Sequence, residues 1–97
     1  MKYLMDYNLT EEDLKDILQT IDEEDQVDLS VHEDSVREII EYLKSKNINN
    51  IKDIFMHNIE VFYTSRAYIQ KVIDSLDPET LKELSEDSSI FNEIFNE

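Results

Sequence analysis

The absence of glycine constrains this chain more than any other feature of its sequence. None of its 97 residues is glycine, and its one proline is Pro78. Tight β-turns, phosphate-binding loops and dinucleotide-binding loops rely on glycine, because glycine reaches positive φ values without steric cost. The sequence therefore predicts helices joined by short connections, and an all-α fold.

The spacing of apolar residues also predicts helices. Leucine, isoleucine and valine recur at i, i+3, i+4 and i+7 within residues 14–21, 36–43 and 69–76, which is the period of an amphipathic helix. We expect helices near residues 10–22, 31–46, 50–57, 65–76, 78–86 and 89–96. Five or six short helices of this kind would form either a compact bundle or a short stacked helical-repeat array.

Polar residues at the expected helix ends support this assignment. Thr10 and Asp77 are candidate N-caps, and Ser30 with Glu33 has the spacing of a capping box,. The asparagines of "SKNINNI" stand where glycine would normally end one helix before the next begins. Asparagine tolerates the left-handed conformation better than other non-glycine residues.

An approximate internal repeat divides the single domain expected over residues 1–97. The segment "YLMDYNLTEEDLKDIL" aligns with "YLKSKNINNIKDIF", so that Asn8 matches Asn47. The repeats would cover residues 3–41 and 42–76, with a partial copy at 77–97. A period near 39 residues is typical of stacked helical units. The alternative is that leucine-rich amphipathic helices align by chance.

The second unit resembles the helical repeat of the mitochondrial transcription termination factor family. The matching residues are Leu43, Ile48, Ile51, Ile54, Phe55, Val61, Phe62, Ile69, Ile73 and Leu76. The bend proline of that family is missing, with Ile59 near its place. The resemblance implies a helical-repeat architecture. Family members bind nucleic acid through basic concave surfaces, and this acidic chain does not share that feature.

Acidic residues dominate both ends of the chain. Lysine and arginine number 9 against 24 aspartate and glutamate residues, which gives a net charge of −15. Residues 1–35 contain 12 acids and two lysines, and residues 77–97 contain seven acids and one lysine. Residues 36–76 are nearly neutral, with five acids and six bases. Such a chain repels nucleic-acid phosphate and attracts cationic proteins.

The densest acidic strip is "QTIDEEDQVDLSVHED", residues 19–34, which holds seven carboxylates and no lysine or arginine. On one continuous helix, Glu12, Asp16, Gln19 and Glu23 would line up opposite the apolar face,. Tyr63 and Arg66, in "IEVFYTSRAYI", are of types common in binding hot spots. The candidate partner-binding residues are Glu11, Glu12, Asp16, Asp22, Glu23, Glu24, Asp25, Asp28, Tyr63 and Arg66.

The sequence alone leaves four interpretations of the acidic residues open. The first is a non-enzymatic inhibitor that mimics nucleic-acid charge and blocks the basic groove of a nucleic-acid-binding protein or nuclease. In composition alone, the chain is similar to phage inhibitors of bacterial defence nucleases, including anti-CRISPR proteins. The second is a helical interaction module without mimicry, and the third is a solvated surface without a specific partner. The fourth is a degenerate EF-hand loop with Asp22 at its first position and Glu33 at its twelfth, although Val27 replaces the glycine,.

Other functional classes are disfavoured. Cysteine is absent, so thiolate metal sites and disulfides are excluded, and a reducing, cytoplasmic location is expected,. No apolar run approaches the roughly 20 residues that span a bilayer. His32 and His57 lie far apart in the sequence, and no motif indicates catalysis. We expect no enzymatic activity, no metal and no cofactor, and dimerisation stays open.

Overall fold

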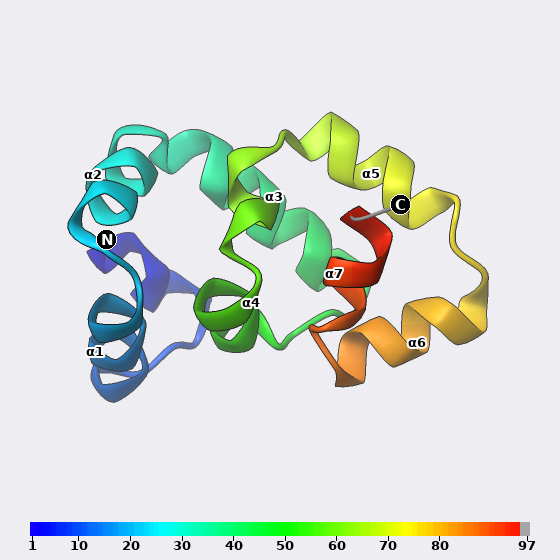
Figure 1. The fold of residues 1–97 in the computed structure, drawn as a ribbon, viewed down its shortest axis with the longest axis horizontal. Helices are drawn as coiled ribbons and strands as arrows, with labels where there is room; N and C mark the ends of the chain where they lie inside the picture. Colours follow the sequence, from blue (N-terminus) through cyan, green and yellow to red (C-terminus); the bar gives the residue numbers. More distant parts are fainter. Residues whose placement is uncertain (96–97) are drawn as a thin grey trace.

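Helices follow one another throughout the computed structural model, which describes residues 1–95 and has no strand among them (Figure 1). The elements are η1 (Lys2–Tyr7), α1 (Glu11–Thr20), α2 (Glu23–Val31), α3 (Glu33–Ser45), α4 (Ile51–His57), η2 (Ile59–Tyr63), α5 (Arg66–Asp74), α6 (Pro78–Glu86) and α7 (Ile90–Phe95), where η marks a 3-10 helix. The all-α prediction is confirmed. The last residue of the helix expected at 89–96 lies outside the described residues.

The acidic strip folds differently from the sequence prediction. The helix expected over residues 10–22 ends at Thr20, because Ile21 takes an extended conformation with φ −89° and ψ 153°. Asp22 then begins a new helix, α2, which continues through Ser30 to Val31. The capping box expected at Ser30 and Glu33 is therefore wrong, and His32 stands at the junction between α2 and α3.

Weak amphipathicity explains why α2 is difficult to recognise from sequence. Leu29 is its only buried residue, whereas Val27 and Val31 are 61% and 72% exposed. The start of the helix relies on polar groups instead. Asp22 accepts a hydrogen bond from the backbone N–H of Asp25. The three acids of the first turn interact favourably with the positive end of the helix dipole and so stabilise the start of α2,.

The caps predicted at Thr10 and Asp77 are confirmed. The Thr10 hydroxyl accepts from the Asp13 backbone N–H, and the Asp13 carboxylate accepts from the Thr10 backbone N–H, which completes a capping box. Asp77 accepts from the backbone N–H of Thr80, with Pro78 in the first helical turn. These contacts satisfy backbone donors that have no partner inside the helix.

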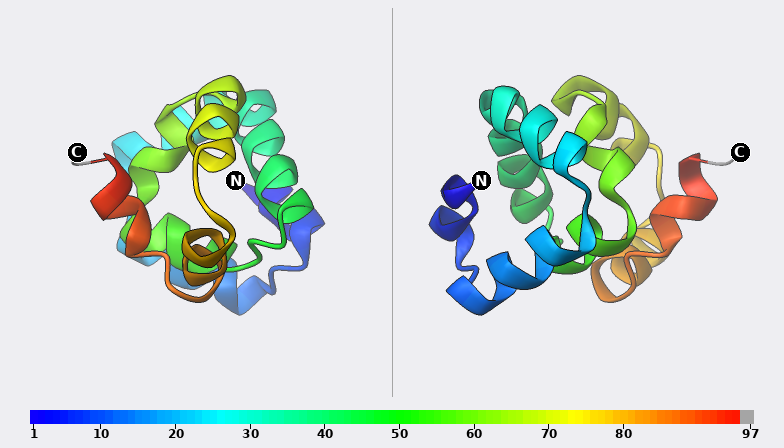
Figure 2. Two further views of the ribbon diagram at one scale, coloured as in Figure 1. Left: turned by 90° about the vertical axis from the view of Figure 1, so that its right-hand side faces the viewer. Right: turned by 60° about the vertical axis from the view of Figure 1, so that its left-hand side comes forward.

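The elements are arranged along a molecule of 34 × 22 × 22 Å. Elements η1, α1 and α2 form one end, and α5, α6 and α7 form the other (Figures 1 and 2). Between them, α3 packs on α2, α5 and η2, while α4 packs on α1 and η2. The acidic N-terminal and C-terminal parts of the chain are thus separated by a nearly neutral centre.

The core is continuous through this centre. Val36, Ile39, Ile40 and Leu43 bury one face of α3. The rings of Phe55 and Phe62 stack with centroids 3.9 Å apart and planes inclined by 9°. Offset or stacked aromatic pairs add to the stability that burial alone provides. This stack holds η2 against α4 and so fixes where the next residue, Tyr63, leaves the core.

Two asparagines attach the C-terminal helices to α4. Nδ2 of Asn50 donates to the carbonyl of Leu84 at 3.3 Å, on α6. Nδ2 of the fully buried Asn58 donates to Oδ1 of Asn92 at 2.7 Å, on α7. Polar contacts inside a protein specify one arrangement because a buried amide is costly without a partner.

The two asparagines matched by the internal repeat have the same backbone conformation. Asn8 and Asn47 have φ values of 66° and 64°, and they are the only non-glycine residues with positive φ within residues 1–95. Each follows a helical segment and precedes a helix-starting turn. The aligned Leu4 and Leu43 are both fully buried, as are the aligned Ile17 and Ile54. The aligned segments therefore share local geometry, while the division of the whole chain into stacked repeats stays a prediction.

No helix in the described part of the chain combines the length and apolar character needed to cross a bilayer.

The left-handed conformation of Asn47 gives a test of this loop. Asn47→Ala should lower the free energy of unfolding by about 1 kcal/mol, because the alanine Cβ clashes in this conformation. Asn47→Gly should change it by less than about 0.5 kcal/mol. Urea denaturation followed by the helical circular dichroism signal measures both. Asn49→Ala is the matched control, since Asn49 is exposed in the same loop without positive φ. Equal losses from all three variants would contradict this account.

Candidate functional site

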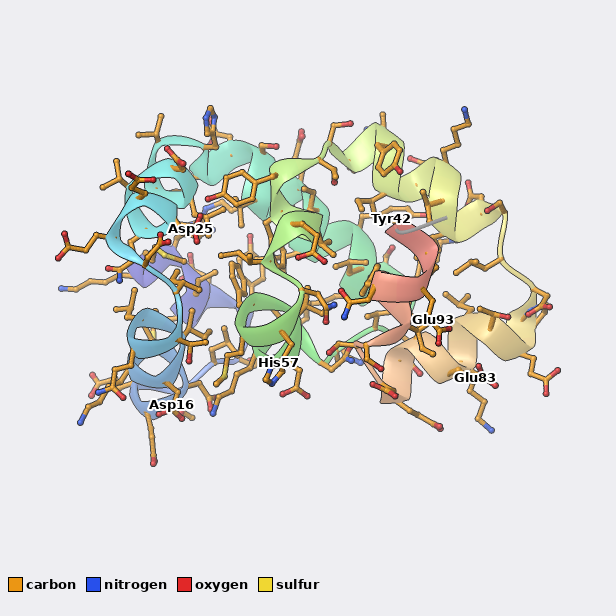
Figure 3. The ribbon with its side chains drawn as sticks, in the orientation of Figure 1. Asp16, Asp25, Tyr42, His57, Glu83 and Glu93 are labelled. Carbon is orange, nitrogen blue, oxygen red and sulfur yellow. The ribbon has the colours of Figure 1, made fainter. Side chains whose placement is uncertain are left out.

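Acidic first turns begin both helices at the N-terminal end of the molecule. Glu11, Glu12 and Asp13 open α1, and Glu23, Glu24 and Asp25 open α2. Carboxylates are favoured at these positions because the helix dipole is positive there. Figure 3 places the labelled Asp16 and Asp25 on the two different helices. Part of the acidity thus has a local structural role in starting α1 and α2.

The expected carboxylate stripe along one helix is wrong. Glu12 and Asp16 belong to α1, but the break at Ile21 places Glu23 on α2. The chain turns between these helices, so that the start of α1 lies away from α2 (Figures 1 and 2), and Glu11 and Glu12 belong to that first turn of α1. The acids therefore form separate groups, and the residues of α2 must be considered by themselves.

Lys52 on α4 binds two acids of α1. Its Nζ lies 3.1 Å from Oδ1 of Asp13 and 2.9 Å from Oδ2 of Asp16. Hydrogen bonding, first to Asp16 and then to Asp13, raises the pKa of the Lys52 ammonium. The backbone N–H of Thr10, followed by Lys52, lowers the pKa of the Asp13 carboxyl. Asp16, a predicted partner-binding residue, is thereby engaged in holding α1 against α4.

Arg37 on α3 binds two further acids. Its Nη2 lies 2.9 Å from Oδ2 of Asp6, and its Nε lies 2.9 Å from Oε2 of Glu33. Its guanidinium carbon also lies 5.3 Å from the ring centre of Tyr3 and 5.8 Å from that of Tyr7. This arrangement combines ion pairs with cation–π contacts, and it holds η1 against α3. No local sequence pattern predicts this contact, because Arg37 and Tyr3 are far apart in the chain.

Tyr3 extends this contact to α2. Its hydroxyl donates to the carbonyl of Leu29 at 2.9 Å. Burial, followed by the charge of Glu33, raises the pKa of the Tyr3 phenol to about 12. The phenol is therefore a stable donor at neutral pH, and it anchors the C-terminal half of α2 to the N-terminal segment.

The carboxylates of α2 divide into two groups. Asp22 caps the helix, and Asp25 accepts a hydrogen bond from the hydroxyl of Tyr63. Glu23, Glu24 and Asp28 are exposed, and within residues 1–95 their carboxylates have no hydrogen-bond or ion-pair partner. We call these three the free α2 carboxylates. Glu24 and Asp28 lie one helical turn apart on the same side of α2.

Tyr63 joins the acidic strip to the aromatic segment, which the sequence analysis treated as separate candidates. The residue is 46% exposed and follows directly on buried Phe62. Burial, the hydrogen bond to Asp25 and then the charges of Asp25, Asp28 and Asp22 raise the pKa of its phenol above the usual range. One predicted acid, Asp25, therefore contacts the predicted aromatic residue Tyr63, and two further acids, Asp28 and Asp22, act on it through their charge.

Arg66 does not belong to this group. It is exposed on α5, where its Nη1 approaches Oε1 of Gln70 at 3.4 Å, and its charge acts on the phenol of Tyr42. Tyr42 in turn donates to Asp74 at 3.1 Å. Tyr63 and Arg66 are three residues apart in the sequence, but their side chains thus have different neighbours.

A small cavity lies between α2 and η2 beside Tyr63. It has a volume of about 260 Å³ and is lined by Leu29, His32, Ser35, Phe62, Tyr63 and Thr64. Leu29 and Phe62 are almost completely buried and supply apolar surface. Asp25 and Asp28 share the α2 face of Leu29 and His32 at helical spacing. The cavity therefore combines apolar walls, hydroxyl groups and a nearby negative charge.

The EF-hand reading is contradicted by the structure. A calcium-binding loop wraps its oxygens around one ion, whereas residues 23–31 form the helix α2. A helix points the acids Glu24 and Asp28 outward from its axis instead of toward a common centre. Within residues 1–95, no group of three or more histidine, cysteine, aspartate or glutamate side chains is arranged to hold a metal ion.

Comparisons of the chain with protein-family models, with curated proteins and with solved structures find no match. The likeness to the repeat of the mitochondrial transcription termination factor family, and the compositional similarity to anti-CRISPR proteins, stay predictions from sequence.

The contact between Lys52 and Asp13 predicts a pH dependence of stability. The pKa of Asp13 is lowered in the folded protein, so its contribution is present above the unfolded value near about 4 and is lost as pH falls through the folded value. Wild-type protein should therefore be more stable than Asp13→Asn at neutral pH, and the difference should disappear in acid. Urea denaturation across this pH range measures it.

The control for this experiment is Asp53→Asn, which removes an exposed acid from α4. It should show a smaller difference from wild type at every pH. A difference between wild type and Asp13→Asn that persists unchanged at low pH would contradict the proposed role of the Asp13 charge.

Proposed function

We propose that this protein is a non-enzymatic inhibitor that binds the basic groove of a nucleic-acid-binding protein or nuclease in place of nucleic acid. The observation that carries the proposal is the set of free α2 carboxylates, Glu23, Glu24 and Asp28, which are exposed on one short helix. The neighbouring acids Asp16, Asp6 and Asp25 are instead engaged by Lys52, Arg37 and Tyr63, respectively. These three charges are therefore available to a partner.

The spacing of the free α2 carboxylates suits a surface that binds phosphates. Residues one turn apart on a helix are separated by about 6 Å along its axis, compared with about 3.4 Å between phosphates along one DNA strand. The two linear charge densities agree within about a factor of two. Arginine and lysine side chains that contact phosphates can also form charge-assisted hydrogen bonds with carboxylates.

The rest of the molecule supports a protein partner over nucleic acid. The net charge is −15, and two of the cations that pack against the acidic end, Lys52 and Arg37, are bound by four carboxylates. Nucleic acid would therefore meet mostly negative charge at this end. A cationic protein would be attracted over a distance set by the salt concentration.

A second candidate function is an interaction module that does not imitate nucleic acid. The exposed Val27 and Val31 favour it, because they lie one turn apart on the outer face of α2. An apolar partner surface would cover them and gain the free energy of burying that area. In this case, binding would depend on the valines and would be insensitive to salt.

Matched charge variants test the proposed function. The variant Glu23→Gln, Glu24→Gln, Asp28→Asn removes three charges from α2, and the control Glu79→Gln, Glu83→Gln, Glu86→Gln removes three exposed charges from α6. Both proteins are immobilised and incubated with nuclease-treated lysate of the source cells. The α2 variant should bind the captured nucleic-acid-binding protein at least about tenfold more weakly than wild type, and the α6 variant should resemble wild type.

Competition distinguishes the two candidate functions. Duplex DNA or single-stranded RNA added to the complex should release the partner if both occupy one groove, and higher salt should also weaken binding steeply. Loss of binding in Val27→Ser, Val31→Ser without any effect of salt or nucleic acid would favour the second candidate. Equal binding by wild type and the α2 charge variant would contradict the proposed function.

A further inference from the structure

We propose that the cavity between α2 and η2 binds one arginine side chain of the partner protein. This inference rests on the proposed function and adds the residue type that the site recognises. The cavity is lined by Leu29, Phe62, Tyr63 and three polar residues, and the Tyr63 hydroxyl at its edge donates to Asp25 of α2. Tyr63, one of its lining residues, is 46% exposed.

The size of the cavity favours a single side chain. Its volume of about 260 Å³ is below the roughly 300–1,000 Å³ of sites that enclose a small-molecule ligand. Leu29 and Phe62 provide the apolar surface at its base, since they are 1% and 2% exposed. The aliphatic stem of a long cationic side chain packs favourably on such a surface while its charged end stays near water.

The charge around the cavity favours a cation. The Asp25 carboxylate accepts a hydrogen bond from Tyr63 at the edge of the cavity, and apart from His32 no basic side chain lines the cavity. An apolar side chain in the same place would remove water from this carboxylate without replacing its hydrogen bonds. A guanidinium can supply hydrogen bonds to Asp28 and to the second oxygen of Asp25, whose first oxygen accepts from Tyr63.

The position of Tyr63 favours arginine over lysine. Its phenol is held by Asp25 and its backbone by the Phe55–Phe62 stack, so the ring has a defined orientation at the edge of the cavity. A planar guanidinium stacks on an aromatic ring and donates two parallel hydrogen bonds to a carboxylate, whereas an ammonium acts as a compact charge.

Three capped tripeptides test this inference without knowledge of the natural partner. Their central residue is arginine, lysine or citrulline, which has the shape of arginine but no charge. Each is titrated into 15N-labelled wild-type protein, and the amide signals of Leu29, His32 and Thr64 report the cavity. The arginine peptide should give saturable shifts and bind at least about threefold more tightly than the lysine peptide, and citrulline should give none.

Two variants complete the experiment. Tyr63→Leu keeps an apolar side chain but removes the ring and should abolish the preference for arginine over lysine. Glu83→Gln removes an exposed acid on α6 and should leave every titration unchanged. If Tyr63→Leu shifts amide signals throughout the protein, the variant is misfolded. The titrations of wild-type protein with the arginine, lysine and citrulline peptides then decide whether the cavity binds arginine.

The possible failures are separable. Equal binding of the arginine and lysine peptides, or shifts of the same size at the acids of α6, would overturn the cavity proposal. The proposed function would then stand or fall on the α2 charge variant and its competition by nucleic acid. Selective arginine binding together with full capture of partner by the α2 charge variant would instead retain the cavity and reject the mimicry of nucleic acid.

Discussion

Two cations hold the acidic end of this protein together. Lys52 binds Asp13 and Asp16 across α4 and α1, and Arg37 binds Asp6 and Glu33 across α3 and the N-terminal segment. Each is about one-third exposed, so each single ion pair contributes little after screening by water. Together they matter more than one ion pair does, because they bring two positive charges to a region where the first 35 residues hold 12 acids and two lysines. Without them, repulsion among these carboxylates would oppose the packing of α1 and η1 on the core.

The same two cations determine which acids of the N-terminal end are held in ion pairs. Asp16 and Asp13 share the ammonium of Lys52, and Asp22 caps α2. The free α2 carboxylates have no such contact, although they lie in the same acidic strip. Acidity in this chain is thus of two kinds, one that builds the N-terminal end and one that remains on its surface. Only the second kind can compensate the charge of a cationic groove, because a carboxylate already paired gains less from another cation.

Features that depend on residues close together in the sequence could be predicted, and features that depend on distant residues could not. Thr10, Asp77 and Asn47 were predictable because caps and left-handed turns depend on residues within four positions. The break at Ile21 was not, because the apolar pattern of Leu14, Ile17, Leu18 and Ile21 continues through it and the acids after it suit any helix start. The contact of Tyr63 with Asp25 joins residues 38 positions apart. A single sequence carries no signal for such a pair, so the two candidates were placed at separate sites.

The arrangement of α2 separates how a partner would be attracted from how it would be retained. In the proposed complex, the free α2 carboxylates face solvent and attract a cationic surface during approach, so they act mainly on the association rate. The cavity beside Tyr63 has room for one side chain and has an apolar base. A side chain buried in it would be released slowly, which lowers the dissociation rate. The phenol of Tyr63 connects the two, because its hydrogen bond to Asp25 holds the ring next to Asp28. A basic protein that lacks an arginine at the matching position would still associate, but it would dissociate faster. This difference in residence time would make the protein selective for one basic partner among many.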